Sequence, residues 1–160
     1  MFRDRSCLLV VPAIVILALN GLGCGGSGGK DEVTAAELVQ RADAICGKER
    51  STFAQVQAHP PPNASVAADQ TGELVKATES ASSQLRELKP PEELQAAYDR
   101  YLEARDRAVE QMKRGKDAAD DRDSAAYGAA QAAVAREAPQ RRKLAQALGL
   151  KACSSSRATA

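Results

Sequence analysis

The chain has 160 residues, about the length of one domain. Tryptophan is absent, aromatic residues make up 3% of the sequence and alanine occurs 32 times, so the composition favours helices and predicts an all-α fold. Without residues 1–23, which contain Arg3, Asp4 and Arg5, 20 basic and 20 acidic residues remain, and a chain with no basic excess is not expected to bind nucleic acid.

The first segment has the parts of a targeting signal. Arg3 and Arg5 give it a positive start, and residues 8–19 are twelve residues without a charge. A membrane-spanning helix needs about 20 apolar residues, so this stretch is too short to span comfortably. The pattern predicts a cleaved signal peptide over residues 1–23.

The run Gly21-Leu22-Gly23-Cys24 resembles the lipobox of bacterial lipoproteins, although Gly21 stands where the usual motif has leucine. The resemblance implies that Cys24 becomes the new N-terminus and carries a diacylglycerol group. That lipid would anchor the protein in the outer face of the cell membrane. Two alternatives stay open: ordinary cleavage would release a soluble protein, and failure of cleavage would leave a helical anchor or a cytoplasmic helix.

Residues 24–33 are predicted to be a flexible tether, because the glycine-rich stretch at residues 25–29 has no side chains to pack. Random-coil scaling gives ten such residues an end-to-end distance of about 17 Å. A folded domain on this tether would lie next to the membrane surface.

Cysteine usage agrees with export. Cys7 would leave with the signal and Cys24 would carry lipid, which leaves Cys46 and Cys153 to form one disulfide in an oxidising compartment. The alternative is two buried, reduced thiols. Zinc is not expected, because these two cysteines and His59 have no metal-binding spacing.

The first helix has the best-defined start. Thr34 and Glu37 form the pattern of a capping box, and Val33 and Leu38 occupy the two positions of a hydrophobic staple. An apolar face follows until His59 and the three prolines after it end the helix.

Two further helices are predicted in the middle of the chain. Ser65 is the expected cap of the second helix, which ends before Pro90. Glu92 and Glu93 place negative charge on the first turn of the third helix, where the helix dipole favours it. The third helix has the strongest apolar face of the chain, formed by Leu94, Tyr98, Tyr101, Leu102, Ala108, Val109 and Met112.

Gly115 and the charged run over residues 116–123 are predicted to connect the third helix to the fourth. The fourth helix is expected to begin near Asp123 and to end at Gly149 as a C-cap. Pro139 interrupts its pattern, and predicts either a kink or a break.

Four amphipathic helices with short connections predict an antiparallel four-helix up-down bundle over residues 34–153, closed by one disulfide. Cys46 lies far along the first helix, so the linker at residues 149–152 must fold back along that helix, or the fourth helix must end at its mid-height. Residues 154–160 are expected to be a disordered tail.

Four short motifs together resemble a group of small secreted or lipidated proteins of high-GC Gram-positive bacteria. They are Ala-Asp-Ala-Ile-Cys at residues 42–46, Pro-Pro-Glu-Glu-Leu at 90–94, Tyr-Asp-Arg-Tyr-Leu at 98–102 and Leu-Gly-Leu-Lys-Ala-Cys at 148–153. The resemblance implies a helical bundle and a cysteine pair, and it implies no activity.

Signs of an enzyme are missing from the sequence. The one histidine, His59, precedes prolines in a predicted loop, and the chain contains no nucleophile elbow, phosphate loop, dinucleotide fingerprint, haem-attachment or di-iron motif. Asp120, Asp121 and Asp123 lack the spacing of a calcium loop. We therefore expect no catalysis, no metal site and no cofactor other than the lipid.

Two hypotheses for function remain, with a purely structural spacer as a third. The favoured one is a lipid-tethered, non-catalytic module that binds an envelope protein or component through a helix face. The alternative is a small-ligand sensor whose bundle opens a pocket of about 300 Å³ or more near Tyr98, Tyr101 and Tyr127. A solid, alanine-rich core would favour the first hypothesis.

Overall fold

The computed structural model describes residues 33–155. This part of the chain is helical and contains no strand, which confirms the all-α prediction. Its helices are α1 (Ala35–Gln57), α2 (Ala64–Glu87), α3 (Glu92–Asp120), α4 (Ser124–Ala147) and α5 (Lys151–Ser154). The sequence pattern did not predict α5 as a helix, and Ser154, expected in the tail, is its last residue.

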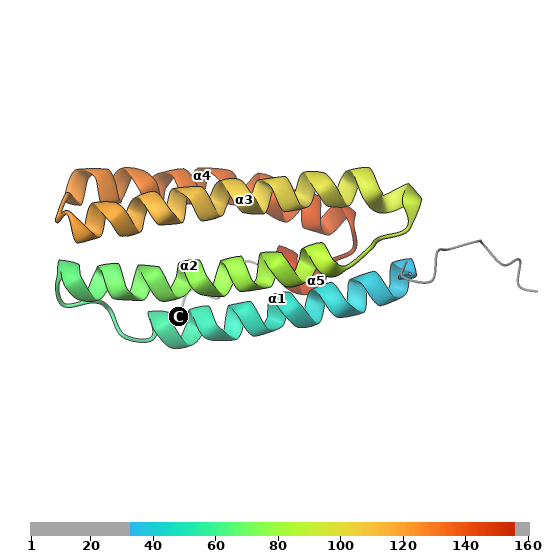
Figure 1. The fold of residues 1–160 in the computed structure, drawn as a ribbon, viewed down its shortest axis with the longest axis horizontal. Coiled ribbons are helices and arrows are strands. Elements are labelled where there is room, and N and C mark those ends of the chain that lie inside the picture. The colour runs from blue at the N-terminus through green and yellow to red at the C-terminus, as the bar shows by residue number, and fades with distance from the viewer. Residues whose placement is uncertain (1–32, 156–160) are drawn as a thin grey trace, which may run out of the picture.

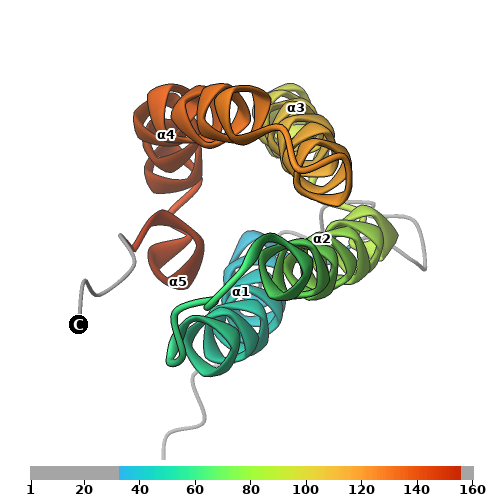
Figure 2. The ribbon, with the colours of Figure 1, turned by 90° about the vertical axis from the view of Figure 1, so that its left-hand side faces the viewer.

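Helices that follow one another in the chain pack side by side: α1 against α2, α2 against α3, and α3 against α4. Figure 1 shows α1 and α2 as one pair and α3 and α4 as the other. The helices α1 and α4 do not pack extensively against each other; α5 packs against both and lies between them (Figure 2). Because α5 has only four residues, it covers only part of this side of the molecule.

The start of α1 matches its prediction. The Thr34 hydroxyl accepts a hydrogen bond from the Glu37 amide at 3.2 Å, and the Glu37 carboxylate accepts one from the Thr34 amide at 2.9 Å. The Thr34 amide and hydroxyl both donate to the Glu37 carboxylate, and these two hydrogen bonds lower the pKa of Glu37. Val33 and Leu38, the staple residues, are both buried in the same core.

The start of α2 differs from its prediction, because Asn63 caps the helix and Ser65 does not. The Asn63 side-chain oxygen accepts a hydrogen bond from the Val66 amide at 3.0 Å. Asparagine is among the strongest N-caps, and Asn63 is the first residue after the prolines that can begin a helix. Ser65 therefore lies exposed in the first turn.

The predicted connection at Gly115 is wrong, because α3 continues to Asp120. Gly115 is buried where α3 meets α4, and a Cβ atom there would lie 3.5 Å from the Cβ of Ala130. This is an ordinary van der Waals distance, so α4 packs against α3 at the glycine. The connection contains only residues 121–123.

The helix α4 passes through Pro139 without a break and ends in a glycine cap. Gly149 has a φ of +75°, as predicted for a C-cap residue. The Gly149 amide donates to Gln146 at 2.9 Å and the Leu150 amide donates to Ala145 at 2.9 Å, which is the Schellman pattern. This turn reverses the chain, so that α5 folds back against α1, one of the two predicted arrangements.

The buried side chains form two clusters. The first, which we call the cysteine-end core, contains Val33, Leu38, Ala42, Cys46, Leu85, Tyr98, Tyr101, Ala145, Leu148 and Leu150. The second, the far-end core, contains Phe53, Val75 and Met112, with Leu74, Ala77 and Val134 partly buried against it. The molecule is therefore packed more extensively at one end than at the other.

Candidate functional site

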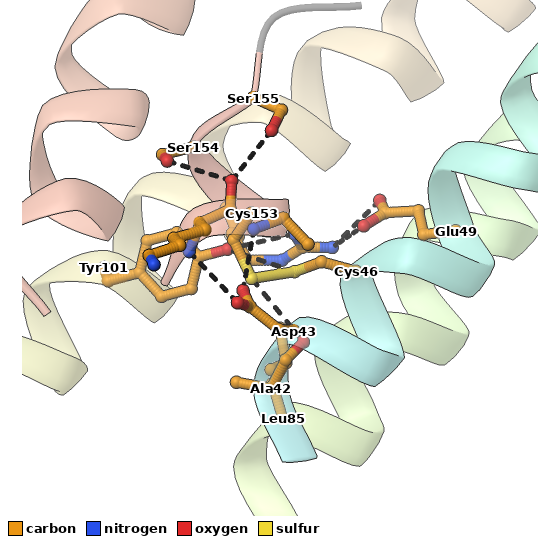
Figure 3. The surroundings of a disulfide bond; sticks show 12 residues. Ala42, Asp43, Cys46, Glu49, Leu85, Tyr101, Cys153, Ser154 and Ser155 are labelled. Atoms are coloured by element: carbon orange, nitrogen blue, oxygen red, sulfur yellow. Dashed lines mark hydrogen bonds and ion pairs between the residues drawn. A yellow bond between two sulfur atoms is a disulfide. The ribbon is translucent and has the colours of Figure 1, made fainter. Parts of the chain in front are cut away.

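The predicted cysteine pair is at disulfide-bonding distance. The sulfur atoms of Cys46 and Cys153 are 2.11 Å apart and their Cα atoms are 5.1 Å apart. Figure 3 shows the bond between α1 and α5. Asp43, one turn earlier on α1, accepts hydrogen bonds from the amides of Lys151 and Ala152 at 3.2 and 2.8 Å. Its carboxylate thus caps α5, and the cysteine pair and the cap together hold α5 on α1.

A buried arginine lies next to the cysteine pair. Arg105, on α3, is 5% exposed and donates two hydrogen bonds of 2.9 Å to the carboxylate of Glu49 on α1. It also donates to the Ser82 hydroxyl at 3.1 Å and to the Tyr101 hydroxyl at 3.3 Å (Figure 3 shows Glu49 and Tyr101). Burial opposes the charge on Arg105, but Tyr101 and Glu49 outweigh it and raise the pKa of the guanidinium. The arginine therefore joins α1, α2 and α3.

Two of the three predicted ligand-binding tyrosines lie together in the core. The rings of Tyr98 and Tyr101 are 6.3 Å apart, and the side chains are 1% and 0% exposed. The Tyr98 hydroxyl donates to the Leu85 carbonyl at 2.7 Å, and the Tyr101 hydroxyl lies 3.7 Å from the Cys46 sulfur. Burial raises the pKa of both tyrosines. Neither lines the two hollows described next, but Tyr98 borders a more open hollow of about 400 Å³, which is lined by the end of α2 and by α3.

Two hollows lie between the helices on the side where α1 and α4 do not meet. The smaller has a volume of about 110 Å³ and lies beside Cys46, Cys153 and Arg105. The larger has a volume of about 340 Å³ and includes Tyr127, the third predicted tyrosine, in its lining. Three side chains line both hollows: Phe53, Met112 and Val134. We call the two hollows together the groove.

The larger hollow is mostly apolar. Its apolar lining residues are Phe53, Val56, Pro60, Pro61, Ala67, Leu74, Met112, Tyr127 and Val134. No Asp, Glu, Lys or Arg is among its lining residues. The Thr71 hydroxyl donates to the Ala67 carbonyl within α2 at 2.7 Å, so this polar group is already bonded. Gln70 donates to the His59 carbonyl at 2.9 Å, which holds the proline loop at the end of the hollow.

The smaller hollow is lined by four charged side chains. Glu49 and Arg105 are the buried pair described above. Arg50 on α1 and Arg141 on α4 are the other two, and both are more exposed than Arg105. The groove thus has one end lined by charged residues and one apolar end.

Sequence reasoning missed Glu49 and Arg105. Each lies on the apolar face of its helix: Glu49 is three residues after Cys46, and Arg105 is four residues after Tyr101. A charge in a position that otherwise repeats apolar residues was the available signal. The partner of each charge was not available from the pattern, because it depends on how the helices are placed.

The predicted signal peptide, the predicted lipid on Cys24 and the predicted tether up to residue 32 lie outside the described residues. The buried residue Val33, expected in the tether, belongs to the folded domain. Within residues 33–155, no helix is long and apolar enough to cross a membrane. The same residues contain no group of three or more histidine, cysteine or acidic side chains arranged to hold a metal ion.

Comparison with known proteins finds no matching family model, no matching curated protein and no matching solved structure.

Proposed function

We propose that this protein is a non-catalytic binding protein that takes a small apolar molecule into the groove between α1 and α4. The larger hollow is the observation that carries the proposal. Its volume of about 340 Å³ lies within the range of about 300–1,000 Å³ usual for ligand pockets. Its lining is mostly apolar and without Asp, Glu, Lys or Arg, so burial of apolar ligand surface would drive binding.

The proposal includes the lipid tether on Cys24, which would hold the domain at the outer face of the cell membrane. It also includes an antiparallel up-down arrangement of the four long helices, left open between α1 and α4. Finding that the mature protein begins at Cys24 and carries added acyl groups would support the tether. Docking of an envelope protein on a helix face stays a prediction.

The groove residues also support a role without catalysis. Arg105 and Glu49 are paired with each other through two hydrogen bonds, so neither is placed to act as a free acid or base. The ionisable side chains that line the larger hollow are His59 and Tyr127. We propose that they contribute surface to a binding site.

The test uses residues 24–160 with Cys24→Ser, a chain that contains every described helix. We expect N-phenyl-1-naphthylamine, an uncharged fluorescent probe, to bind this protein saturably with one site per chain. Val134→Trp would fill the junction of the two hollows and weaken binding by about tenfold or more, equivalent to about 1.4 kcal/mol.

Ala135→Trp is the matched control, because Ala135 is the next residue of α4, is exposed and lines neither hollow. It should keep the affinity of the unsubstituted protein. Equal affinity for both tryptophan variants, with helical circular dichroism retained, would contradict binding in the groove.

A further inference from the structure

The two ends of the groove differ in charge. The larger hollow has no lining Asp, Glu, Lys or Arg, whereas the smaller has three arginines and one glutamate. Phe53, Met112 and Val134 line both, so one elongated ligand could contact both ends. A ligand that fits both ends would need an apolar body and a charged or polar head.

The charged residues that line the smaller hollow indicate whether the head group of the ligand is anionic or cationic. The lining contains three arginines and one glutamate, so its charged residues carry an excess of positive charge. Glu137 lies one turn before Arg141 on α4, and even if it is counted in full the excess stays positive. Guanidinium groups bind carboxylates and phosphates well, because their donors match two oxygens of the anion.

We propose that the ligand of the groove is a single-chain amphiphile with an anionic head group. Its head would lie beside Arg50 and Arg141, and its apolar chain would fill the larger hollow. One chain is favoured over two because about 340 Å³ is near the lower limit for ligand pockets. This inference rests on the proposed function, since it assumes that the groove binds a ligand.

Displacement of the uncharged naphthylamine probe by three ten-carbon compounds tests the inference. Decanoate, decanol and decyltrimethylammonium share the chain and differ in the charge of the head. We expect decanoate to displace the probe at a concentration at least about tenfold below that of decanol, because hydrogen bonds to charged groups are the stronger kind. Decyltrimethylammonium should be the weakest competitor.

The double variant Arg50→Gln with Arg141→Gln should remove the advantage of decanoate over decanol, with each displacement corrected for the affinity of that variant for the uncharged probe. The control is Arg136→Gln with Arg142→Gln, which removes two positive charges from α4 at residues that line neither hollow. This control should keep the advantage of decanoate.

The outcomes separate the two proposals. If the probe binds but decanoate and decanol compete equally, the anionic head is wrong and the groove remains a binding site. Loss of the decanoate advantage in both double variants would mean that it reflects overall charge and would also overturn the inference. If the probe does not bind at all, the proposed function fails, and the inference fails with it.

Discussion

The cysteine end and the far end of the molecule are built from the same four long helices, but they are packed differently. At the cysteine end, five large side chains are less than 2% exposed: Leu38, Leu85, Tyr98, Tyr101 and Leu150. At the far end, the large buried side chains Phe53 and Met112 keep 7% and 9% exposure and line both hollows. The fifth helix accounts for part of the difference, because it fills the space between α1 and α4 at only one end.

We expect the cysteine end to contribute most of the stability and the far end to provide the binding site. Apolar burial, the cysteine pair and the buried Arg105 all lie at or beside the cysteine end. The far end is less closely packed, and its hollow of about 340 Å³ is lined mostly by apolar side chains, whereas the hollow of about 400 Å³ beside Tyr98 is bordered by Arg86, Asp99, Glu103 and Asp106. We therefore expect changes at the cysteine end to lower the free energy of unfolding more than changes at the far end.

Of the changes considered, loss of the cysteine pair should lower the free energy of unfolding the most. The pair closes a loop of 107 residues, and the chain-entropy model gives such a loop up to about 4.7 kcal/mol. Urea unfolding of the oxidised protein and of Cys46→Ala with Cys153→Ala measures this difference. In the double variant, amide exchange should speed up more in α5 than in α2. Without the cysteine pair, α5 would be held mainly by Asp43 and Leu150.

Reduction of the unsubstituted protein serves as the control, and should lower the urea midpoint about as much as the double substitution. If neither reduction nor the double substitution lowers the urea midpoint, the cysteine pair does not stabilise this end. The pair would then not explain the difference in stability between the two ends.

Removal of Arg105 should have the next largest effect, because it leaves the buried carboxylate of Glu49 without its partner. Arg105→Met is expected to cost about 3 kcal/mol, the lower end of the range for breaking a buried ion pair. Arg105→Met with Glu49→Leu should recover most of this loss, since no charge is then left buried. Urea unfolding of both variants and of Glu49→Leu completes a double-mutant cycle. Additive costs would show that the two side chains do not act as a pair.

Local signals in the sequence predicted much of the fold. The capping box at Thr34, the prolines after His59 and the glycine at residue 149 each act within a few residues, and all three marked a helix boundary correctly. Gly115 misled because it lies inside α3 and packs against α4, a contact that the local pattern does not show. The cysteine pairing followed from the expectation that Cys7 leaves with a signal peptide and that Cys24 carries lipid, which left two thiols to pair.

The candidate site was less predictable, because it is made of spaces between helices. Tyr98, Tyr101 and Tyr127 share an aromatic chemistry, but only Tyr127 lines the larger hollow. Which side chain fills a space and which borders one depends on the distance between helices. The absence of close packing between α1 and α4 is a property of the whole assembly, and no short motif encodes it.

The smallest of these effects is the contribution of the buried tyrosines at the cysteine end to the dependence of stability on alkaline pH. Burial raises the pKa of Tyr98 and Tyr101 in the folded protein above the ordinary value of 10.0. Below pH 10 both states keep these protons, whereas above it only the unfolded state releases them. The free energy of unfolding should therefore fall above pH 10, by up to about 1.4 kcal/mol per pH unit for each tyrosine.

Tyr98→Phe should halve this tyrosine contribution, because it leaves Tyr101 as the one buried phenol of the pair. Loss of the hydrogen bond to Leu85 costs about 1 kcal/mol at pH 7, so the variant starts less stable and approaches the unsubstituted protein between pH 10 and 11. Asn63→Ala at the far end is the matched control: it also costs about 1 kcal/mol, through the cap of α2, but removes no titratable group. Its deficit in urea unfolding should be the same at pH 7 and pH 11. If the loss of unfolding free energy caused by Tyr98→Phe is also the same at pH 7 and pH 11, the buried phenols do not make stability depend on pH.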